Sequence, residues 1–271
     1  MRPAWSSSFE EGTLREAVTE LPPVVTREWA WDGADGAGVD VAIIDSGIDA
    51  EHPAVGGVEG WIAFEYDEDS PGETRVLEGP HEDLFGHGTA CAAIIRRVAP
   101  RARLHSVRVL GTNLKTRGVV FAAGLRWAVE HGMRVINLSL SSSSRDYFAL
   151  FHELADLAYF RGALLVSAIN NVPGASYPSE YASVVSVAAN DATDPFAIDY
   201  NPSPPVEFGA PGIDLEVAWR GGGTMRSSGN SFAAPHVAGL AARILSKHPT
   251  LTPFQMKTVL HAVSRNVVPA S

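Results

Sequence analysis

The chain has 271 residues, of which 45% are hydrophobic, so it can bury a sizeable core, and α/β folds of this size commonly form one domain. It carries 21 Lys and Arg against 31 Asp and Glu, and the net charge of −10 would repel a phosphate backbone, so we expect no nucleic-acid partner. The single cysteine excludes an internal disulfide framework, and no apolar run is long enough to cross a bilayer, so we expect no membrane association.

Residues 1–38 differ in composition from the rest of the chain. They are polar and rich in Trp, Pro and Gly, with a short predicted helix at 13–20 followed by the extended piece LPPVV at 21–25. The first thirty residues lack both a basic n-region and an apolar h-region, so we expect a cytoplasmic protein. We interpret 1–38 as an appendage and 39–271 as the folded domain.

From residue 39 onward, short apolar runs alternate with helical patterns. Five runs are rich in Val, Ile and Leu without polar alternation, which is typical of strands covered on both faces in a parallel sheet. These runs are VAIID (41–45), LHSVRVL (104–110), VINLSL (135–140), ALLVSAI (163–169) and VVSVAA (184–189). The predicted helices span 87–97, 118–131, 146–161, 231–246 and 252–264. This βαβ alternation predicts an α/β fold with a mostly parallel central sheet.

Polar residues directly after the strands are candidates for a binding site, because ligands of such sheets bind outside the carboxyl ends of the strands. Asp45, Ser139, Asn170 and Asn171 occupy such positions. An aspartate at a strand end is more often a turn former or a helix cap than a catalytic group. Asp45 therefore needs partners before a role can be assigned.

Two further residues supply these partners. His87 lies in DLFGHGTACA, where two glycines leave space around the imidazole. Ser231 precedes an apolar helical run, where a serine is either an N-cap or a nucleophile, and Pro235 is tolerated in the first helical turn. A nucleophilic serine needs a base within hydrogen-bond reach and a third group that orients this base. Asp45, His87 and Ser231 therefore gain meaning jointly.

The order Asp, His, Ser along the chain is that of subtilisin and differs from the orders in chymotrypsin and α/β-hydrolases. The segments VAIIDSGID, GHGTACA and SGNSFAAPHVAG resemble the Asp, His and Ser signatures of the subtilisin-like serine proteases, the subtilases, and the similarity runs from about residue 29 to 264. The resemblance implies a three-layer α/β/α sandwich around a parallel sheet. It also implies that residues 39–271 form a catalytic domain, and 1–38 suggests a short pro-segment.

The resemblance implies a role for each matching residue. Ser231 would attack a peptide carbonyl, His87 would transfer the proton, and Asp45 would orient the imidazole. Asn170 would donate to the oxyanion, and we prefer it to Asn171, whose alternative reading is a turn residue.

The segment Ser139, Leu140 and Ser141 would pair with the substrate backbone and form one wall of the pocket for the residue before the cleaved bond. Ala168 and Ile169 belong to the opposite wall. Relatives have Gly where this chain has Ile169 and Ser141. The added side chains predict a shallow pocket that prefers small residues.

Two departures from the family concern calcium. Only Arg96 and Arg97 separate the His-motif helix from VAPRARL, where many relatives insert a calcium loop, and Ala54 replaces an Asp that is a ligand of the same ion. We therefore expect no tight calcium site and no cofactor. A weaker ion site using Glu207 and carbonyls near 177–181 stays open.

Two other residues have simpler interpretations. His236, within the helix after Ser231, matches a histidine that is structural in relatives. Cys91 lies one helical turn beyond His87, where thiol-containing subtilases keep a buried cysteine, so we expect sensitivity to mercurials.

Three functions remain open. The first is an endopeptidase that acts as a monomer on peptides or proteins with restricted specificity, such as removal of a leader peptide. The second is a catalytically silent binding module. The third is an esterase or acyltransferase with the same triad. The segment LPPVV at 21–25 either leads into the core or blocks the cleft as a plug.

Overall fold

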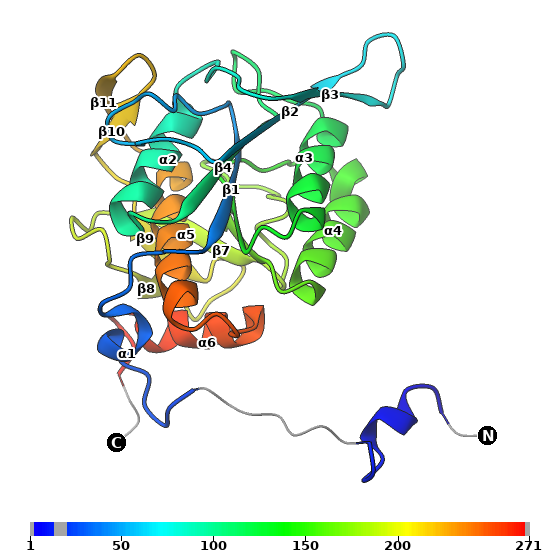
Figure 1. The fold of residues 1–271 in the computed structure, drawn as a ribbon, viewed down its shortest axis with the longest axis vertical. Helices are drawn as coiled ribbons and strands as arrows, with labels where there is room; N and C mark the ends of the chain where they lie inside the picture. Colours follow the sequence, from blue (N-terminus) through cyan, green and yellow to red (C-terminus); the bar gives the residue numbers. More distant parts are fainter. Residues whose placement is uncertain (1–2, 14–20, 269–271) are drawn as a thin grey trace.

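Within residues 3–13 and 21–268, which the computed structural model describes, nine strands form one sheet (Figure 1). Their order is β3-β2-β4-β1-β5-β6-β7-β9-β8, and only the outer pairs β2/β3 and β8/β9 are antiparallel. The strands are β1 (Asp40–Asp45), β2 (Gly60–Tyr66), β3 (Thr74–Glu78), β4 (Arg103–Arg108), β5 (Val135–Leu138), β6 (Leu164–Ala168), β7 (Val185–Asn190), β8 (Asp199–Tyr200) and β9 (Phe208–Pro211). The mostly parallel sheet is the predicted one.

Helices cover both faces of this sheet (Figure 1). Helices α2 (His87–Val98) and α5 (Asn230–Lys247) pack on one face, and α3 (Gly118–Glu130) and α4 (Phe148–Phe160) pack on the other. The short α1 (Arg27–Trp31) contacts α5. The last helix, α6 (Pro253–Ala262), follows α5 in the chain. The predicted α/β/α sandwich is confirmed.

The central strand β1 shows why its sequence lacks polar alternation. Val41 and Ile43 lie in the hydrophobic cluster that contains α2 and α5, whereas Ala42 and Ile44 lie in the cluster that contains α3 and α4. All four side chains are at most 1% exposed. Because successive residues point to opposite faces, a strand covered on both sides is apolar throughout.

The five predicted strands and five predicted helices are all present, and their ends differ from the predicted ones by at most two residues. The outer strands were missed: β8 and β9 have only two and four residues, β3 is mostly exposed, and the seven-residue β2 is buried only at its centre. Also missed was the hairpin of β10 (Leu215–Trp219) and β11 (Gly223–Ser227), which stands apart from the main sheet. Gly221 and Gly222 at its tip adopt positive φ, the conformation that a tight hairpin favours.

The N-terminal part of the chain does not lie entirely outside the core. After a 3-10 turn at Ser6–Phe9, the helix predicted at 13–20 falls almost wholly outside the described residues. Ala30 and Trp31 of α1 are buried in the same cluster as α5, so the packed domain begins before residue 39.

The segment 21–25 lies far from the start of helix α5. Leu21 and Val25 pack against the α5 cluster, and Lys247 Nζ donates to the carbonyl oxygen of Glu28 at 2.8 Å. Lys247 is the last of the 18 residues of α5, whose length is about 27 Å. The segment therefore packs at the opposite end of this helix from Ser231, which does not support a plug in the cleft.

Across the described residues, each helix is either too short or too polar to span a bilayer.

Candidate active site

The structure brings Asp45, His87 and Ser231 into one hydrogen-bonded chain. Asp45 is the last residue of β1, His87 the first of α2 and Ser231 the second of α5. His87 Nδ1 lies 2.9 Å from each carboxylate oxygen of Asp45, and His87 Nε2 lies 2.9 Å from Ser231 Oγ. Asp45 is fully buried and His87 is 8% exposed. The three elements meet at the carboxyl end of the central strand, where the sequence predicted a site.

Glycines allow the end of β1 and the start of α2 to approach this closely. A Cβ atom at Gly88 would lie 2.0 Å from the carbonyl oxygen of Gly47, and one at Gly47 would lie 2.4 Å from that of Glu82. Both distances are far below van der Waals contact. A side chain at Gly88 would therefore push the start of α2 away from the end of β1, and one at Gly47 would displace the loop that leads to His87.

Asp83 is a site residue that the sequence analysis missed. Its buried carboxylate accepts from Ser46 Oγ at 2.7 Å, from Gly86 N at 2.8 Å, and from the backbone and hydroxyl of Thr89 at 2.9 and 2.6 Å. It thus caps helix α2, whose N-cap residue is a glycine without a side-chain acceptor. An Asp three residues before a Gly-His helix start was the available signal.

Burial and the carboxylate of Asp45 have opposite effects on the pKa of His87. Burial alone would lower the pKa of the imidazole. The charge of Asp45 and its hydrogen bond oppose this effect and hold the pKa of His87 well above its usual range. Asp45 therefore stabilises the protonated imidazole.

Ser231 is not the N-cap of α5; that position belongs to Gly229, and the Ser231 hydroxyl is free to contact His87. Within the described residues the Ser231 backbone N–H has no hydrogen-bond partner. A Cβ atom at Gly229 would lie 3.2 Å from Ser231 Oγ, so glycine keeps the space before this hydroxyl open.

Pro235 is the sixth residue of α5, beyond the first turn in which the sequence analysis placed it. Because proline has no N–H, the carbonyl oxygen of Ser231 loses its usual helical partner. That oxygen instead accepts from Ser139 Oγ at 2.7 Å and faces Cys91 Sγ at 3.6 Å. Ser139 in turn accepts from Asn137 Nδ2 at 3.0 Å, so the start of α5 is fixed to the end of β5.

Asn230 ties the start of α5 to the ends of β6 and β7. Its side chain accepts from Ala189 N at 2.9 Å and donates to the carbonyl oxygens of Ile169 and Asn170, both at 3.1 Å. Its own backbone N–H donates to Asn171 Oδ1 at 2.9 Å. Asn230 therefore positions the loop that carries Asn170.

A cleft of about 510 Å³ opens in front of Ser231 and His87. Every residue predicted to bind substrate or the oxyanion lines it: Ser139, Leu140, Ser141, Ala168, Ile169 and Asn170. Asn171 lines it too, while Asn170 Nδ2 makes only a long hydrogen bond of 3.4 Å to the carbonyl oxygen of Ala175. One N–H of the Asn170 amide thus stays available.

His236 is separate from this site. It is 3% exposed, and its Nδ1 donates to the carbonyl oxygen of Pro195 at 3.1 Å. Burial lowers its pKa to about 4, so the imidazole is neutral.

Basic side chains occupy the regions where the sequence analysis considered calcium. The guanidinium of Arg96 donates to four backbone carbonyl oxygens, those of Val55, Gly57, Pro100 and Ala102, at 2.8 to 3.2 Å. These carbonyls belong to the loop after Ala54 and to the segment after α2. Because they already bind a cation of the protein, they do not fit a tight calcium site.

Glu207 is engaged in the same way. Lys257 Nζ lies 2.8 Å from Glu207 Oε1 and donates to the carbonyl oxygen of Ala182 at 2.8 Å. The ammonium group stands between a carboxylate and a carbonyl, the ligands that a weak ion site would use.

We expect the melting temperature to be the same in EDTA and in calcium. Arg96→Met should lower the free energy of unfolding by about 3 kcal/mol, because hydrogen bonds from a charged donor are lost and carbonyls are left unpaired. Thermal and urea denaturation would measure both effects. A large fall in melting temperature with the chelator would contradict the expectation.

The comparisons with known proteins agree with this geometry. The profile of the Subtilase family matches residues 36–269. The chain is 34% identical over 239 residues to Subtilisin BL of Lederbergia lenta, covering 84% of each chain. It is 33% identical to Subtilisin amylosacchariticus of Bacillus subtilis subsp. amylosacchariticus, covering 86% of this chain and 62% of that relative. The fold is similar to the crystal structure of a cold adapted subtilisin-like serine proteinase, with a TM-score of 0.69 and 28% identity over 83% of this chain and 81% of the other. The chain therefore belongs to the subtilase family, that of the subtilisin-like serine proteases.

Proposed function

We propose that this chain is a serine endopeptidase. The observation that carries the proposal is the hydrogen-bonded chain from Asp45 through His87 to Ser231 at the wall of an open cleft. Family membership supports the same activity. A silent binding module would not need a base positioned 2.9 Å from a free serine hydroxyl.

The geometry assigns a step to each group. Ser231 Oγ attacks the substrate carbonyl while His87 Nε2 takes its proton, and the imidazolium then protonates the leaving amine. Asp45 holds Nδ1–H and stabilises the imidazolium. The unpaired backbone N–H of Ser231 and the side-chain amide of Asn170 donate to the oxyanion.

Labelling with a fluorophosphonate tests the proposal. We expect wild type to be labelled and Ser231→Ala to remain unlabelled. Absence of labelling in both would favour the silent module. Labelling of wild type without cleavage of any peptide in a library would favour an esterase or acyltransferase.

We infer a narrow specificity for the residue before the cleaved bond, suited to a processing role such as removal of a leader peptide. Ile169 and Ser141 both line the cleft, and they add side-chain volume at positions where the resemblance to subtilases implies glycine. A peptide library should show preferred cleavage after small or slender residues. Strong cleavage after Phe or Tyr would refute this specificity. In that case Ile169→Gly should leave the preference for the residue before the cleaved bond unchanged.

The pH dependence follows from His87. The base must be neutral to accept a proton, and Asp45 raises its pKa, so His87 is protonated and inactive below that pKa. We expect kcat/KM to rise with pH through this pKa, with lower activity at about pH 6 than at about pH 9. Asp45→Asn should shift the rising limb to lower pH. A rate that falls as pH rises over this interval would contradict the assignment.

Cys91 makes the site sensitive to thiophilic metals. Its Sγ is buried and lies 4.0 Å from His87 Nδ1 and 3.8 Å from Asp45 Oδ2. A mercury atom on this sulfur would displace the imidazole. We expect mercuric chloride to inhibit wild type and to have little effect on Cys91→Ala. Equal inhibition of both proteins would show that mercury acts elsewhere.

A further inference from the structure

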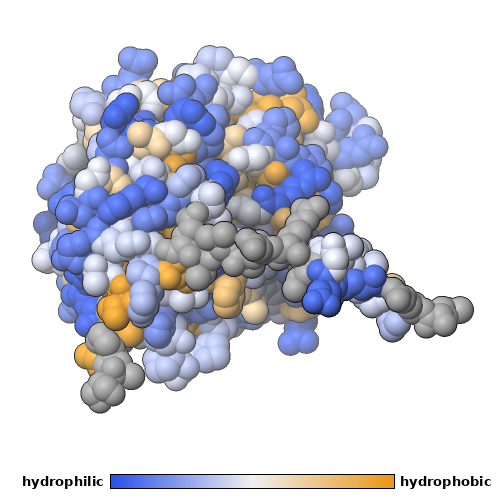
Figure 2. All heavy atoms as spheres, turned by 60° about the horizontal axis from the view of Figure 1, so that its bottom comes forward, coloured by the Kyte–Doolittle hydropathy of each residue, from blue (hydrophilic) through white to orange (hydrophobic). Residues whose placement is uncertain are grey.

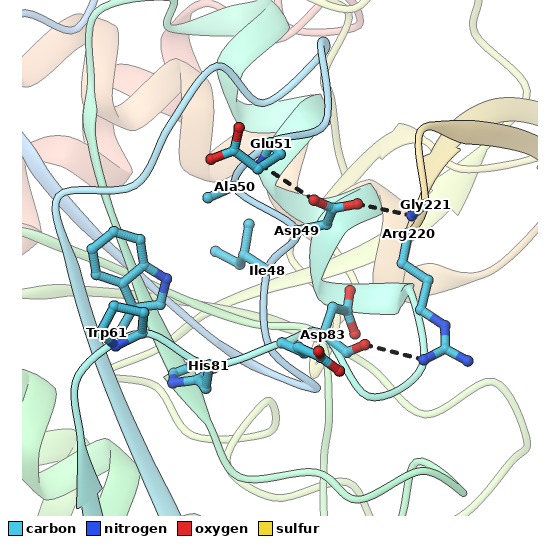
Figure 3. Close-up of a pocket in the computed structure, with 11 residues that line it drawn as sticks. Ile48, Asp49, Ala50, Glu51, Trp61, His81, Asp83, Arg220 and Gly221 are labelled. Atoms are coloured by element: carbon cyan, nitrogen blue, oxygen red, sulfur yellow. Dashed lines mark hydrogen bonds between the residues drawn. The ribbon is translucent and has the colours of Figure 1, made fainter.

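A second cavity, of about 680 Å³, lies beside the cleft and takes no part in the proposed chemistry (Figure 3). It lies between the loop after β1, the start of β2, the loop that leads to His87 and the tip of the β10–β11 hairpin. We name it the acidic pocket. Its lining includes Asp49, Glu51, Trp61, Glu82, Asp83 and Arg220. Its volume falls within the range of about 300–1,000 Å³ that is typical of ligand sites.

The acidic pocket carries uncompensated negative charge. Four acidic residues line it against one guanidinium; the Asp83 carboxylate bonds to Ser46 and the start of α2, which leaves Asp49, Glu51 and Glu82 to charge the pocket. Within the described residues, the side chains of Glu51 and Glu82 have no hydrogen bond or ion pair, and the Asp49 carboxylate accepts only from backbone N–H groups. Arg220 Nη1 donates to the backbone carbonyl of Asp83 at 3.3 Å and pairs with no carboxylate. A hollow lined by one sign of charge concentrates the field on a ligand of the opposite sign.

His81, which also lines the pocket, adds no positive charge. Burial lowers the pKa of its imidazole to about 4, so the ring is neutral at pH 7.

The spacing of the carboxylates argues against a metal ion. Among the described residues, only Asp45, His87 and Cys91 form a group of three ligand side chains whose donor atoms lie within 4.8 Å of one another. The carboxylates of the acidic pocket therefore do not converge on one ion. Dispersed carboxylates suit an extended organic cation.

Trp61 supplies a surface for such a cation. It is the second residue of β2, is partly buried, and stands across the pocket from Asp49 and Arg220 (Figure 3). A guanidinium or ammonium group over an indole face is attracted by the ring electrons, and the apolar stem packs beside it. The combination of Trp61 with Glu51 and Glu82 fits a basic side chain.

The acidic pocket and the cleft share a wall. Phe85 and Trp219 line the cleft, and their ring centroids are 5.6 Å apart. Asp83 and Arg220, which line the pocket, precede Phe85 by two residues and follow Trp219 by one. A polypeptide in the cleft can therefore reach the pocket across this wall.

We propose that the acidic pocket binds an arginine or lysine side chain of the polypeptide substrate, away from the bond that is cleaved. The proposal rests on the proposed peptidase function, which supplies a polypeptide in the adjacent cleft. It extends that function by a basic residue as a second determinant of substrate choice.

Binding can be tested without catalysis, in the full chain with Ser231→Ala. The probe is N-acetylarginine amide, and its uncharged control is N-acetylcitrulline amide. We expect the arginine probe to shift the NMR signal of the Trp61 indole N–H, identified by its loss in Trp61→Phe. The double change Glu51→Gln and Glu82→Gln should weaken binding by about tenfold.

A matched control removes the same charge elsewhere. Glu130→Gln with Glu153→Gln changes two exposed carboxylates on α3 and α4 and should leave binding unchanged. Equal shifts by the arginine and citrulline probes would overturn the proposal, as would equal losses in the two double variants.

Kinetics then link the pocket to the substrate. In fluorogenic peptides with one shared core, a single Arg is moved through each position on both sides of the cleaved bond. We expect one position to raise kcat/KM by about tenfold over Ala, mainly through KM, and Glu51→Gln with Glu82→Gln to abolish this gain. Efficient cleavage without preference for Arg at any position would overturn the proposed role of the acidic pocket but not the peptidase function. Absence of both cleavage and fluorophosphonate labelling, with the arginine probe still bound, would instead overturn the peptidase function.

Discussion

Replacing Ser231 with Ala is expected to lower kcat for peptide hydrolysis by about 10⁶-fold, with little change in KM; this is the loss measured for the triad serine of subtilisin, a relative of this chain. The physical reason is that Oγ, 2.9 Å from His87 Nε2, is the atom of Ser231 that would form the covalent bond to the substrate carbonyl. The backbone N–H, which donates to the oxyanion, survives the change. Residual catalysis over water should therefore persist.

The triad should behave as one unit. Combining Ser231→Ala with His87→Ala should cost no more than Ser231→Ala alone, because a base without a nucleophile does nothing. Asp45→Asn should cost about 10⁴-fold, since the imidazole loses its correct tautomer. Steady-state kinetics with a cleavable library peptide would measure these losses.

Ser246→Ala is the matched control on the same helix. Ser246 Oγ lies near the other end of α5, where it donates to the carbonyl oxygen of Arg243 and accepts from Gly36 N. Its loss should leave kcat unchanged.

If the fold-losses of Ser231→Ala and His87→Ala multiplied in the double variant, the two residues would act independently, which would contradict a shared proton path.

The buried layers were predictable because burial leaves a direct mark on sequence. Residues 41–44 of β1, which is covered on both faces, are all apolar, and three of the four residues of its neighbour β5 are apolar as well. The outer strand β3 has four exposed residues in five, and β11 likewise. Such strands carry little hydrophobic signal, so their pairing depends on turn geometry that the sequence states only weakly.

The triad was predictable for a different reason. Each of its members lies in a motif with small neighbours, and the order of the motifs along the chain identifies the arrangement. Asp83 and Asn230 were not assigned, for two different reasons. Asp83 caps the helix that begins three residues later, a local signal that spacing does carry. Asn230 acts through hydrogen bonds to backbone atoms of distant segments, which composition and spacing alone do not reveal.

Arg96 shows the same limit of prediction from sequence. In the sequence, Arg96 is one of two residues in a short connection, with no sign of a structural role. In the fold its guanidinium gathers four carbonyls from two loops. The sequence predicts that no tight calcium site is present, but it does not reveal the group that binds these carbonyls.

Replacing Asn170 with Ala is expected to lower kcat by about 10² to 10³-fold at nearly constant KM, the range measured for loss of the side-chain oxyanion donor in subtilisin. Asn170 has an amide N–H left over beyond its 3.4 Å bond to the Ala175 carbonyl, and it lines the cleft with Ser231. The donor acts on the charge that develops in the transition state. Its loss should therefore appear in kcat.

Asn171→Ala is the comparison that decides between the two neighbouring amides. Asn171 Oδ1 accepts from Asn230 N at 2.9 Å, so its side chain holds the first residue of α5. Its loss should lower the free energy of unfolding by about 1 kcal/mol and reduce kcat much less than Asn170→Ala does. If Asn171→Ala instead produced the larger fall in kcat at unchanged stability, the oxyanion donor would be Asn171. Asn170→Asp sharpens the comparison, because a carboxylate of the same shape would repel the developing oxyanion and should cost more than Ala.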